Sequence, residues 1–266
     1  MTLYYEEYGD KNAPLIVFLH GGGVSGWMWE QQVTFFAQHY HCLVPDLPGH
    51  GTNSGDSYFS MEEAAVLIID LIDKVANNRK ITVIGFSLGA QIIVQALSMR
   101  PNLVDTAVII SALVRPMPSV VKWIAPAIKL SFPLISNRTF SKIQAQTLYI
   151  PQEKFTQYYE ESCRMSQHVL ISVLKENMSF SIPENFSNVT TAMLVMVGEK
   201  EKAMMKKSAN DLVDCNVNCD AMVIADIGHG ISLANPTLFN DIVYNWLSAR
   251  HTNNSENNEC QAHKQF

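Results

Sequence analysis

The sequence predicts an α/β fold built on a mostly parallel sheet of seven or eight strands. Short apolar, β-branched runs alternate with amphipathic runs of helical spacing, and the connections between them are short. Runs that are apolar at every position suit strands covered on both faces, as in a parallel sheet. The alternation therefore favours a doubly wound architecture. The predicted strands are 2–8 (at an edge), 15–19, 42–44, 81–86, 106–110, 192–197 and 221–224.

Helix signals lie between these strands. Ser60 and Glu63 form a capping-box pattern, in which two polar side chains satisfy the first free N–H groups of a helix. Arg100-Pro101 ends another helix, because the residue before a proline avoids helical backbone angles. Asn235-Pro236 is a favourable start for the last helix. The predicted helices are 27–40, 60–75, 91–99, 202–213 and 236–247.

The alternation fails between residues 115 and 189. Amphipathic segments broken by prolines take its place, at 120–134, 139–149 and 153–176. Aromatic and Met side chains are frequent here, and they would form the small core of an extra helical layer, line an apolar pocket above the sheet, or do both. We expect a helical cap at 115–189, a core at 1–114 and 190–250, and a flexible polar tail at 251–266. The predicted substrate-binding residues are Trp123, Phe155 and Phe86.

Composition narrows the classes of partner and compartment. Charged residues make up 17% of the chain and the net charge is −6; without a Lys/Arg cluster, this argues against nucleic acid or an anionic membrane as partner. No apolar run approaches the 18 or so residues of a membrane span, and no leader pattern opens the chain. The five cysteines are scattered and Cys215/Cys219 lack further ligands nearby, which argues against zinc. We therefore expect a cytoplasmic monomer or homodimer without metal or cofactor.

The candidate nucleophile lies in the stretch Ile81–Ala90. A β-branched run ends in Gly85-Phe86-Ser87-Leu88-Gly89, and a helical pattern follows at once. This arrangement holds a serine on a strained turn at the carboxyl end of a strand, and glycine at positions 85 and 89 removes side chains that would clash there. The Leu88 N–H would open the new helix, where the dipole favours negative charge.

A serine hydroxyl needs a base to take its proton and donors for the oxyanion that forms. His229 is the candidate base, because it follows the last strand in a Gly-His-Gly turn and comes after the serine in the chain. His20 is expected to brace the glycine loop, and His50 lies on another loop. The second oxyanion donor, beside Leu88, is expected from the loop after strand 15–19, with Gly22 preferred. The remaining histidines considered, His39, His41 and His168, suit surface or packing roles.

The acid that orients the histidine is expected on the loop after the strand that ends at Val197. Glu199 and Glu201 both qualify, and Glu201 is preferred because it stands further out along the loop. Both would also be favourable as plain helix-start carboxylates. Asp226 is too close in sequence to His229 to reach round to its Nδ1 atom.

Together these motifs resemble the α/β-hydrolase superfamily, and within it the single-domain esterase-type branch with a helical cap. The resemblance covers nearly the whole chain. It implies the α/β-hydrolase fold with the cap inserted after strand 6 of the common core, a Ser87–Glu201–His229 triad, and an acyl-enzyme mechanism. There are two departures: Glu stands where this branch more often has Asp, and one strand is visible where the family usually has a hairpin. The motifs are His20 to Gly22, Asp46 to Gly51, Gly85 to Gly89, Gly198 to Glu201, and Gly228-His229.

The expected function is hydrolysis of a carboxylic ester or thioester of a small to medium apolar substrate. The same fold and triad also support C–C bond hydrolysis, lyase chemistry and acyl transfer, and a weakly catalytic small-molecule receptor can retain the triad. Fold does not choose among these activities, because activity is set by the site. The acyl and leaving groups depend on which cap side chains face the pocket, and periodicity leaves that open.

Overall fold

A single mixed sheet forms the centre of the molecule. The computed structural model describes residues 3–55 and 58–262, with residues 251–262 described only as helical backbone. The seven strands lie in the order β1-β3-β2-β4-β5-β6-β7; β1 runs antiparallel to β3, and every other pair is parallel. The predicted mostly parallel α/β sheet is therefore confirmed. The strands are β1 (Tyr5–Tyr8), β2 (Leu15–Leu19), β3 (His41–Pro45), β4 (Ile81–Phe86), β5 (Thr106–Ile110), β6 (Ala192–Gly198) and β7 (Cys219–Ile224).

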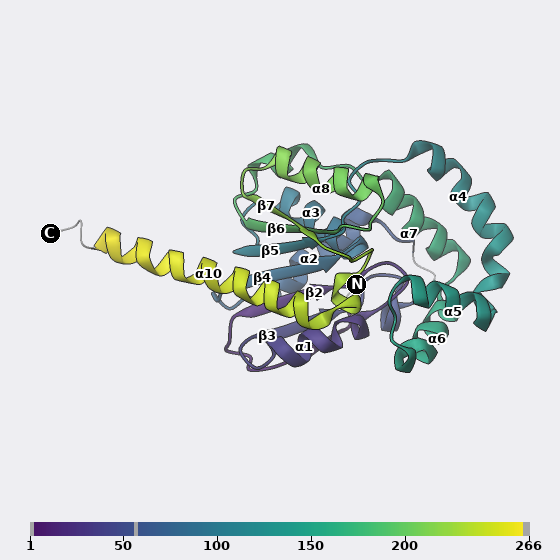
Figure 1. Cartoon of the computed structure of the whole chain (residues 1–266), viewed down its shortest axis with the longest axis horizontal. Coiled ribbons are helices and arrows are strands. Elements are labelled where there is room, and N and C mark those ends of the chain that lie inside the picture. Colours follow the sequence, from purple (N-terminus) through teal and green to yellow (C-terminus); the bar gives the residue numbers. More distant parts are fainter. Residues whose placement is uncertain (1–2, 56–57, 263–266) are drawn as a thin grey trace.

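Helices cover both faces of this sheet (Figure 1). Alternate residues of β2 belong to different hydrophobic clusters: Leu15, Val17 and Leu19 face one layer, and Ile16 and Phe18 face the other. All five residues of β2 are buried as a result, which explains its unbroken apolar sequence. One layer holds α2 (Met61–Val75), α3 (Leu88–Met99) and α8 (Ala203–Cys215); the other holds α1 (Glu30–Phe36) and α10 (Pro236–Ala262).

The cap lies between β5 and β6, at one end of the sheet (Figure 1). The strand before the cap, β5, is the fifth strand of this chain, whereas the resembled family has the cap after its sixth. The numbers differ because the described residues hold one strand before Pro14, where that family usually has two. The sequence predicts one long segment at 153–176, but the helix ends at Arg164 and Ser166 caps a new one by accepting from the Val169 N–H at 3.3 Å. The cap helices are α4 (Pro118–Ser131), η3 (Phe132–Ser136), α5 (Arg138–Thr147), η4 (Gln152–Lys154), α6 (Phe155–Arg164), α7 (Gln167–Ser179) and η5 (Glu184–Asn188).

The stretch Pro118–Ser136 differs from the expectation that no segment is long and apolar enough to span a membrane. It is helical over 19 residues, with a mean hydropathy of 1.2 and only 6% of it buried, so length and composition alone would allow it to cross a membrane. The sequence shows no unbroken apolar run of that length because Lys122 and Lys129 interrupt it.

The last helix, α10, reaches Ala262 and extends past the sheet (Figure 1). It therefore includes residues 251–262 of the segment expected to be a flexible tail, and residues 263–266 lie outside the described part of the chain. Short elements complete the fold: η1 (Gly26–Trp29), η2 (Gly51–Asn53) and α9 (Ile231–Ala234).

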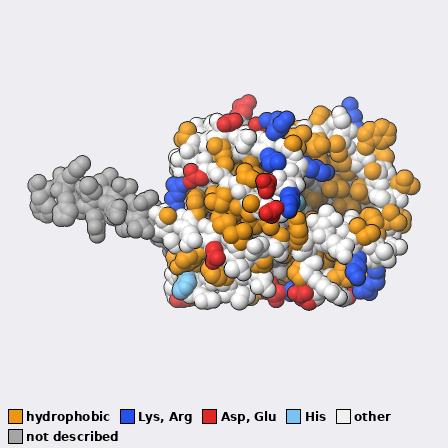
Figure 2. Space-filling model, in the orientation of Figure 1, with side chains coloured by type: hydrophobic (Ala, Val, Ile, Leu, Met, Phe, Trp, Pro, Cys, Tyr) orange, Lys and Arg blue, Asp and Glu red, His pale blue; other side chains and the backbone are white. Residues whose placement is uncertain are grey.

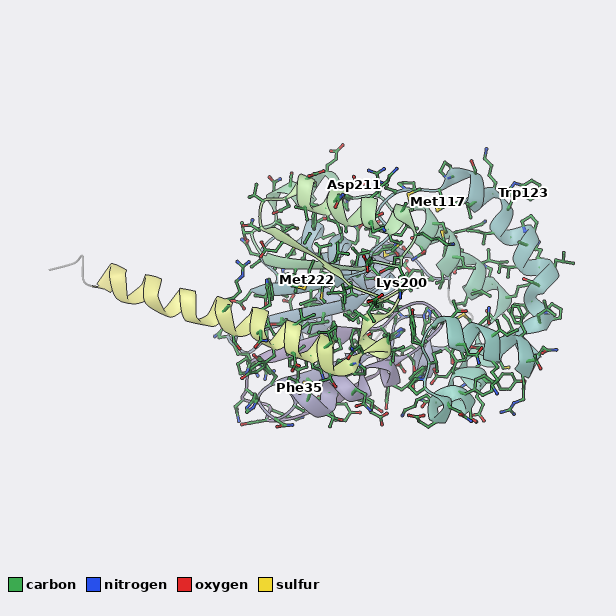
Figure 3. All side chains as sticks on the ribbon, viewed as in Figure 1. Phe35, Met117, Trp123, Lys200, Asp211 and Met222 are labelled. Carbon is green, nitrogen blue, oxygen red and sulfur yellow. The ribbon has the colours of Figure 1, made fainter. Side chains whose placement is uncertain are left out.

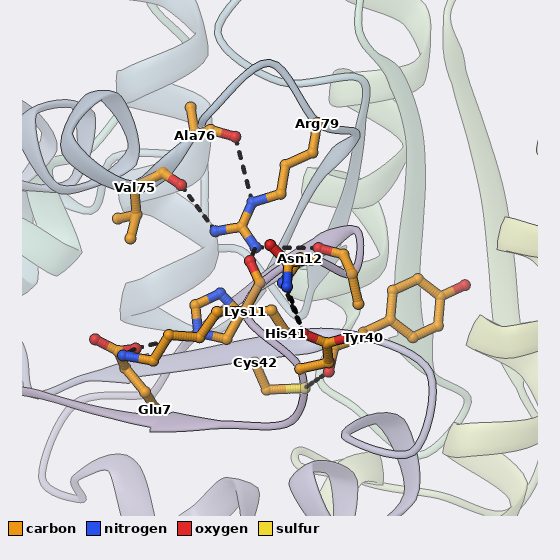
Figure 4. A network of polar contacts seen from close by, with 11 residues as sticks. Glu7, Lys11, Asn12, Tyr40, His41, Cys42, Val75, Ala76 and Arg79 are labelled. Atoms are coloured by element: carbon orange, nitrogen blue, oxygen red, sulfur yellow. Dashed lines mark hydrogen bonds and ion pairs between the residues drawn. The ribbon is translucent and has the colours of Figure 1, made fainter.

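The amino end of the central strands is held by an arginine (Figure 4). The Arg79 guanidinium, just after α2, donates to the Val75 carbonyl at 2.8 Å and to the Ala13 carbonyl at 3.1 Å. These bonds tie the loop before β2 to the helix that precedes β4. Nearby, Glu7 forms an ion pair with Lys11 at 2.6 Å. The polar network thus fixes the strand ends opposite the edge where the chemistry is expected.

Candidate active site

Ser87 occupies a strained turn between β4 and α3. Its backbone has φ 51° and ψ −107°, in a region that non-glycine residues rarely adopt. A Cβ atom at Gly85 would lie 2.6 Å from the Gly89 carbonyl oxygen, and one at Gly89 would lie 2.4 Å from the Leu19 carbonyl oxygen. Both contacts are too short for any side chain. The two glycines therefore permit the close backbone approach that raises Ser87 at the carboxyl end of β4.

Glu201 and His229 lie side by side. The His229 Nδ1 atom is 2.8 Å from the Glu201 Oε2 atom. The other carboxylate oxygen, Oε1, accepts from the Ser111 hydroxyl at 2.7 Å and from the Gly198 N–H at 2.9 Å. The Glu201 side chain is 1% exposed, so its charge is satisfied by these three donors rather than by water. A carboxylate only accepts, so Nδ1 carries the proton and Nε2 keeps a free lone pair for a base.

The other acids of this edge make different contacts. Glu199 is exposed and accepts from the Asp226 N–H at 3.0 Å. Asp226 forms an ion pair with Lys200 at 3.0 Å. In this structure His229 is thus paired with Glu201, while Glu199 contacts the backbone of Asp226. The Glu201 loop lies directly against the histidine loop at Gly198, where a Cβ would lie 2.4 Å from the Ile227 carbonyl oxygen.

Phe86 connects the serine turn to the histidine loop. Its ring lies 4.8 Å from the His229 ring, between centroids. It also packs against Gly21, where a Cβ would lie 2.8 Å from the Phe86 ring and 3.6 Å from the Ser87 Cβ atom. Among the described residues no hydrogen bond joins the Ser87 hydroxyl to His229; such bonds often form only when substrate is bound. Ser87 and the Glu201–His229 pair nevertheless share one sheet edge.

The first glycine loop lies against the start of α3. A Cβ at Gly22 would be 3.8 Å from the Leu88 side chain, so the two residues expected to donate to the oxyanion are neighbours. His20 holds this loop: its Nδ1 atom lies 2.7 Å from the Gly21 carbonyl oxygen, and its Nε2 atom accepts from the Leu47 N–H at 2.9 Å. Burial lowers the pKa of His20 to about 4. The expectation that His20 braces the loop is confirmed, and it is kept neutral there.

The loop from Asp46 to Gly51 forms the neighbouring wall of the site. The Asp46 carboxylate accepts from the Gly26 N–H at 2.9 Å and from the Thr52 N–H at 2.7 Å. Burial, with a smaller contribution from His20, lowers the pKa of His50 to about 3. The His50 Nδ1 atom lies 3.0 Å from the Pro48 carbonyl oxygen. His50 is therefore a neutral wall residue, which leaves His229 as the histidine paired with a carboxylate at this edge.

A cavity of about 380 Å³ opens between these loops and the cap. It touches the serine edge through Gly22, which lies against Leu88, and through Leu148 of the cap. Neither Ser87 nor His229 is itself a lining residue. The lining residues are Gly22, Gly23, Val24, Gly49, His50, Gly51, Ile135, Ile143, Gln144, Thr147, Leu148, Tyr158, Glu161, Ser162, Met165 and Leu170.

The three residues predicted to bind substrate are not among the lining residues of this cavity. Trp123 is 71% exposed and points away from the sheet on the outer side of α4 (Figure 3). Phe155 lies on α6, and the Arg138 guanidinium carbon lies over its ring, 5.8 Å from the centroid of the Phe155 ring. Phe86 is buried beneath the histidine. Helical periodicity shows which residues share a face, but it does not show which face turns inward.

Two residues of the site, Ser111 and Tyr149, were not predicted from the sequence. Ser111, with φ 55° just after β5, donates to Glu201 because β5 and β6 are neighbours in the sheet. Tyr149, with φ 57°, accepts from the Gly228 N–H at 3.2 Å through its hydroxyl and so connects the cap to the histidine loop. Neither has a local motif that marks it. Among the described residues no three His, Cys, Asp or Glu side chains are grouped to hold a metal ion.

The chain is similar to known proteins over most of its length. It is 25% identical to the putative carbamate hydrolase RutD of Stutzerimonas stutzeri, over 92% of this chain and 97% of that protein. It is 24% identical to the pimeloyl-[acyl-carrier protein] methyl ester esterase of Methylococcus capsulatus, over 62% of this chain and 55% of that protein. The structure of MenH from S. aureus superposes with a TM-score of 0.76 at 17% identity, over 93% of this chain and 99% of that chain.

The family comparison covers more than half of the sequence. The profile described as the alpha/beta hydrolase family matches residues 16–242, a span that includes Ser87, Glu201 and His229. The sheet order, the serine turn after β4 and the cap before β6 agree with that match. The chain therefore belongs to the alpha/beta hydrolase family.

Proposed function

We propose that the protein is a serine hydrolase that cleaves a carboxylic ester or thioester of a small to medium apolar substrate through an acyl-enzyme. The observation that carries the proposal is the buried carboxylate of Glu201 bonded at 2.8 Å to His229, beside a serine in strained backbone. Burying a carboxylate is costly unless donors surround it. The three donors to Glu201 come from three separate strand ends, an arrangement suited to orienting a histidine as a general base.

The geometry suggests roles for each group. Ser87 Oγ would attack the carbonyl carbon while His229 Nε2 takes its proton. The Leu88 and Gly22 N–H groups would stabilise the oxyanion, and Glu201 would stabilise the imidazolium that forms. His229 would then give the proton to the departing alcohol or thiol. Water, deprotonated by the same histidine, would attack the acyl-Ser87 carbonyl and release the acid.

The cavity supports an apolar acyl group. Its cap side includes five apolar side chains beside polar ones, and its core side is formed by the glycine loops. The apolar residues of the cap side are Ile135, Ile143, Leu148, Met165 and Leu170, and the polar ones are Gln144, Thr147, Tyr158, Glu161 and Ser162. A volume of about 380 Å³ lies within the range of small-molecule sites. The methyl ester esterase relative is also named for cleaving an ester. The neutral His50 adds one polar wall group without adding charge.

The proposal is tested by turnover of p-nitrophenyl esters graded by acyl length. We expect kcat/KM to pass through a maximum at short to medium chains, because the cavity bounds the acyl group that fits. Ser87→Ala should lower turnover by about 10⁴-fold or more while the thermal midpoint of unfolding stays unchanged. Folded wild-type protein that turns over no ester in the series, or Ser87→Ala protein that retains full activity, would overturn the proposal.

A carbamate is a second candidate substrate class. Relatives named putative carbamate hydrolase align with 92% and 90% of this chain. A carbamate carbonyl would use the same nucleophile, oxyanion donors and base. Comparing kcat/KM for an ester and a carbamate that share one acyl-side group and one leaving group decides between the two classes. A higher value for the carbamate would make it the preferred substrate.

A further inference from the structure

The outer side of the cap carries an apolar stripe that the fold leaves uncovered. Val120, Trp123, Ala127, Leu130 and Leu134 recur at helical spacing along Pro118–Ser136 and are all exposed; we call them the cap outer face. Trp123 is 71% exposed and Leu130 is 86% exposed. The opposite side of α4 packs against α7. The helix is therefore apolar on two sides, and burial in the fold accounts for only one of them.

Charge is segregated onto the same part of the chain. Residues 115–152 contain five Lys or Arg and no Asp or Glu, whereas the whole chain has a net charge of −6. Arg115 is paired with Asp211. The other four, Lys122, Lys129, Arg138 and Lys142, form no ion pair among the described residues, and all four are exposed. Figure 2 shows hydrophobic atoms over the cap end of the molecule, with Lys and Arg atoms at its upper and lower margins.

From this combination we infer that the cap outer face docks on an anionic lipid bilayer. Large exposed apolar side chains, Trp included, beside unpaired Lys and Arg are what an interfacial helix uses: the apolar stripe enters the acyl boundary and the cations meet anionic headgroups. A second copy of the chain is a poorer match, because twofold pairing through this face would set the unpaired cations against their own copies. The acidic remainder of the molecule would be turned away from the bilayer.

Docking in this way brings one wall of the cavity close to the lipid surface, because the cap outer face and the cavity wall meet in η3. Leu134 belongs to the cap outer face and the next residue, Ile135, lines the cavity. Ile143 also lines the cavity and is 59% exposed. An apolar acyl substrate would then reach the cavity from the bilayer with little exposure to water. This consequence for the substrate rests on the proposed function, whereas docking itself requires no catalysis.

The test is co-sedimentation of the full chain with vesicles. We expect binding to phosphatidylcholine vesicles that contain phosphatidylglycerol, weaker binding to phosphatidylcholine alone, and loss of the difference at high salt. Trp123→Ser with Leu130→Ser should lower the partition coefficient at least about tenfold on both vesicle types. Lys122→Glu with Lys129→Glu should lower it about tenfold on phosphatidylglycerol vesicles only.

Matched control variants distinguish docking through the cap outer face from nonspecific membrane binding and from catalysis. Val217→Ser removes a side chain that is 99% exposed outside the cap, and Lys74→Glu reverses an exposed charge near the end of α2; both should bind as wild type. Ser87→Ala should also bind as wild type, so failure of the proposed function would leave the binding result intact. Absence of binding to phosphatidylglycerol vesicles, binding that both double variants retain, or a solution dimer dissociated by Trp123→Ser with Leu130→Ser would overturn the inference.

Discussion

The loops that follow strands β2 to β7, which we call the strand-end loops, differ from the cap helix α4 in how much of the chain is buried. At the strand ends backbone and side chains are tightly determined: all six residues of β4 are buried, and Glu201 is held by three hydrogen bonds. In the cap, by contrast, α4 buries only Ile124 of its 14 residues. The comparison indicates that the strand ends hold Ser87, Glu201 and His229 in place, whereas α4, with one buried residue, leaves most of its surface exposed or half-buried. Substitutions in the two regions should therefore differ in kind.

The largest expected effect is at the acid of the strand-end loops. Glu201→Gln should lower kcat by about 10³- to 10⁴-fold, because an amide can hold the wrong histidine tautomer. Glu199→Gln, the matched control on the same loop, should leave kcat within about threefold, because the Glu199 side chain is exposed and, within the described part of the chain, accepts a hydrogen bond from the Asp226 N–H rather than from His229. The measurement is steady-state ester turnover. If Glu199→Gln were the inactive variant, the acid assignment would move to that residue.

The next largest effect is expected on stability, where an added side chain would clash with a neighbouring backbone segment. Gly198→Ala should lower the free energy of unfolding by about 1–3 kcal/mol, because a Cβ there would lie 2.4 Å from the Ile227 carbonyl oxygen. Gly55→Ala should have almost no effect, since a Cβ there meets nothing within 4 Å. Urea unfolding measures both. Equal stabilities for the two variants would show that the strand-end loops are less tightly determined than the structure indicates.

A third contrast concerns buried and exposed histidines. The unfolded chain protonates its histidines near pH 6.5, whereas burial lowers the native pKa of His20 to about 4 and that of His50 to about 3. Below about pH 6.5 the unfolded state therefore binds more protons than the native state. The free energy of unfolding should fall with falling pH, by about 1.4 kcal/mol per pH unit for each histidine, until the native groups also protonate.

Urea unfolding at several pH values between 7 and 5 checks this dependence. His50→Gln should reduce the slope by about half of the contribution from the two buried histidines, because glutamine does not titrate. The matched control is His168→Gln, which removes an exposed histidine from the cap. A slope that His50→Gln leaves unchanged would argue that the histidines of the strand-end loops are not held neutral.

The smallest expected effect lies where the two regions touch. Tyr149→Phe removes the hydroxyl that accepts from the Gly228 N–H, so the histidine loop loses one contact with the cap. We expect kcat to fall about three- to tenfold, because the loop that carries His229 is held less firmly, and the free energy of unfolding to fall by no more than about 1 kcal/mol, the worth of one neutral hydrogen bond. Stopped-flow turnover with a fast ester resolves such a change. A fall in stability without a fall in kcat would make Tyr149 a structural contact only.

The same contrast governs what the sequence can predict. The strands, the serine turn and the Glu201–His229 neighbourhood follow local rules, such as apolar runs, close glycines and loops at strand ends. Ser111 and Tyr149 act through long-range contacts that leave no local pattern. Trp123 was predicted to bind substrate because aromatic and Met side chains are frequent in the cap, and composition does not show which of them face inward; Trp123 is 71% exposed. The net charge of −6 likewise gives no sign of the basic segment 115–152, because a net total does not show where the charges lie along the chain.

Labelling with a fluorophosphonate is the most direct test of the proposal that Ser87 is an activated nucleophile. We expect one adduct per chain, located by peptide mass spectrometry on the Gly85–Gly89 turn. Labelling should be lost in Ser87→Ala and strongly slowed in Glu201→Gln. Folded wild-type protein that takes up no label, or label found on another residue, would rule out an activated Ser87.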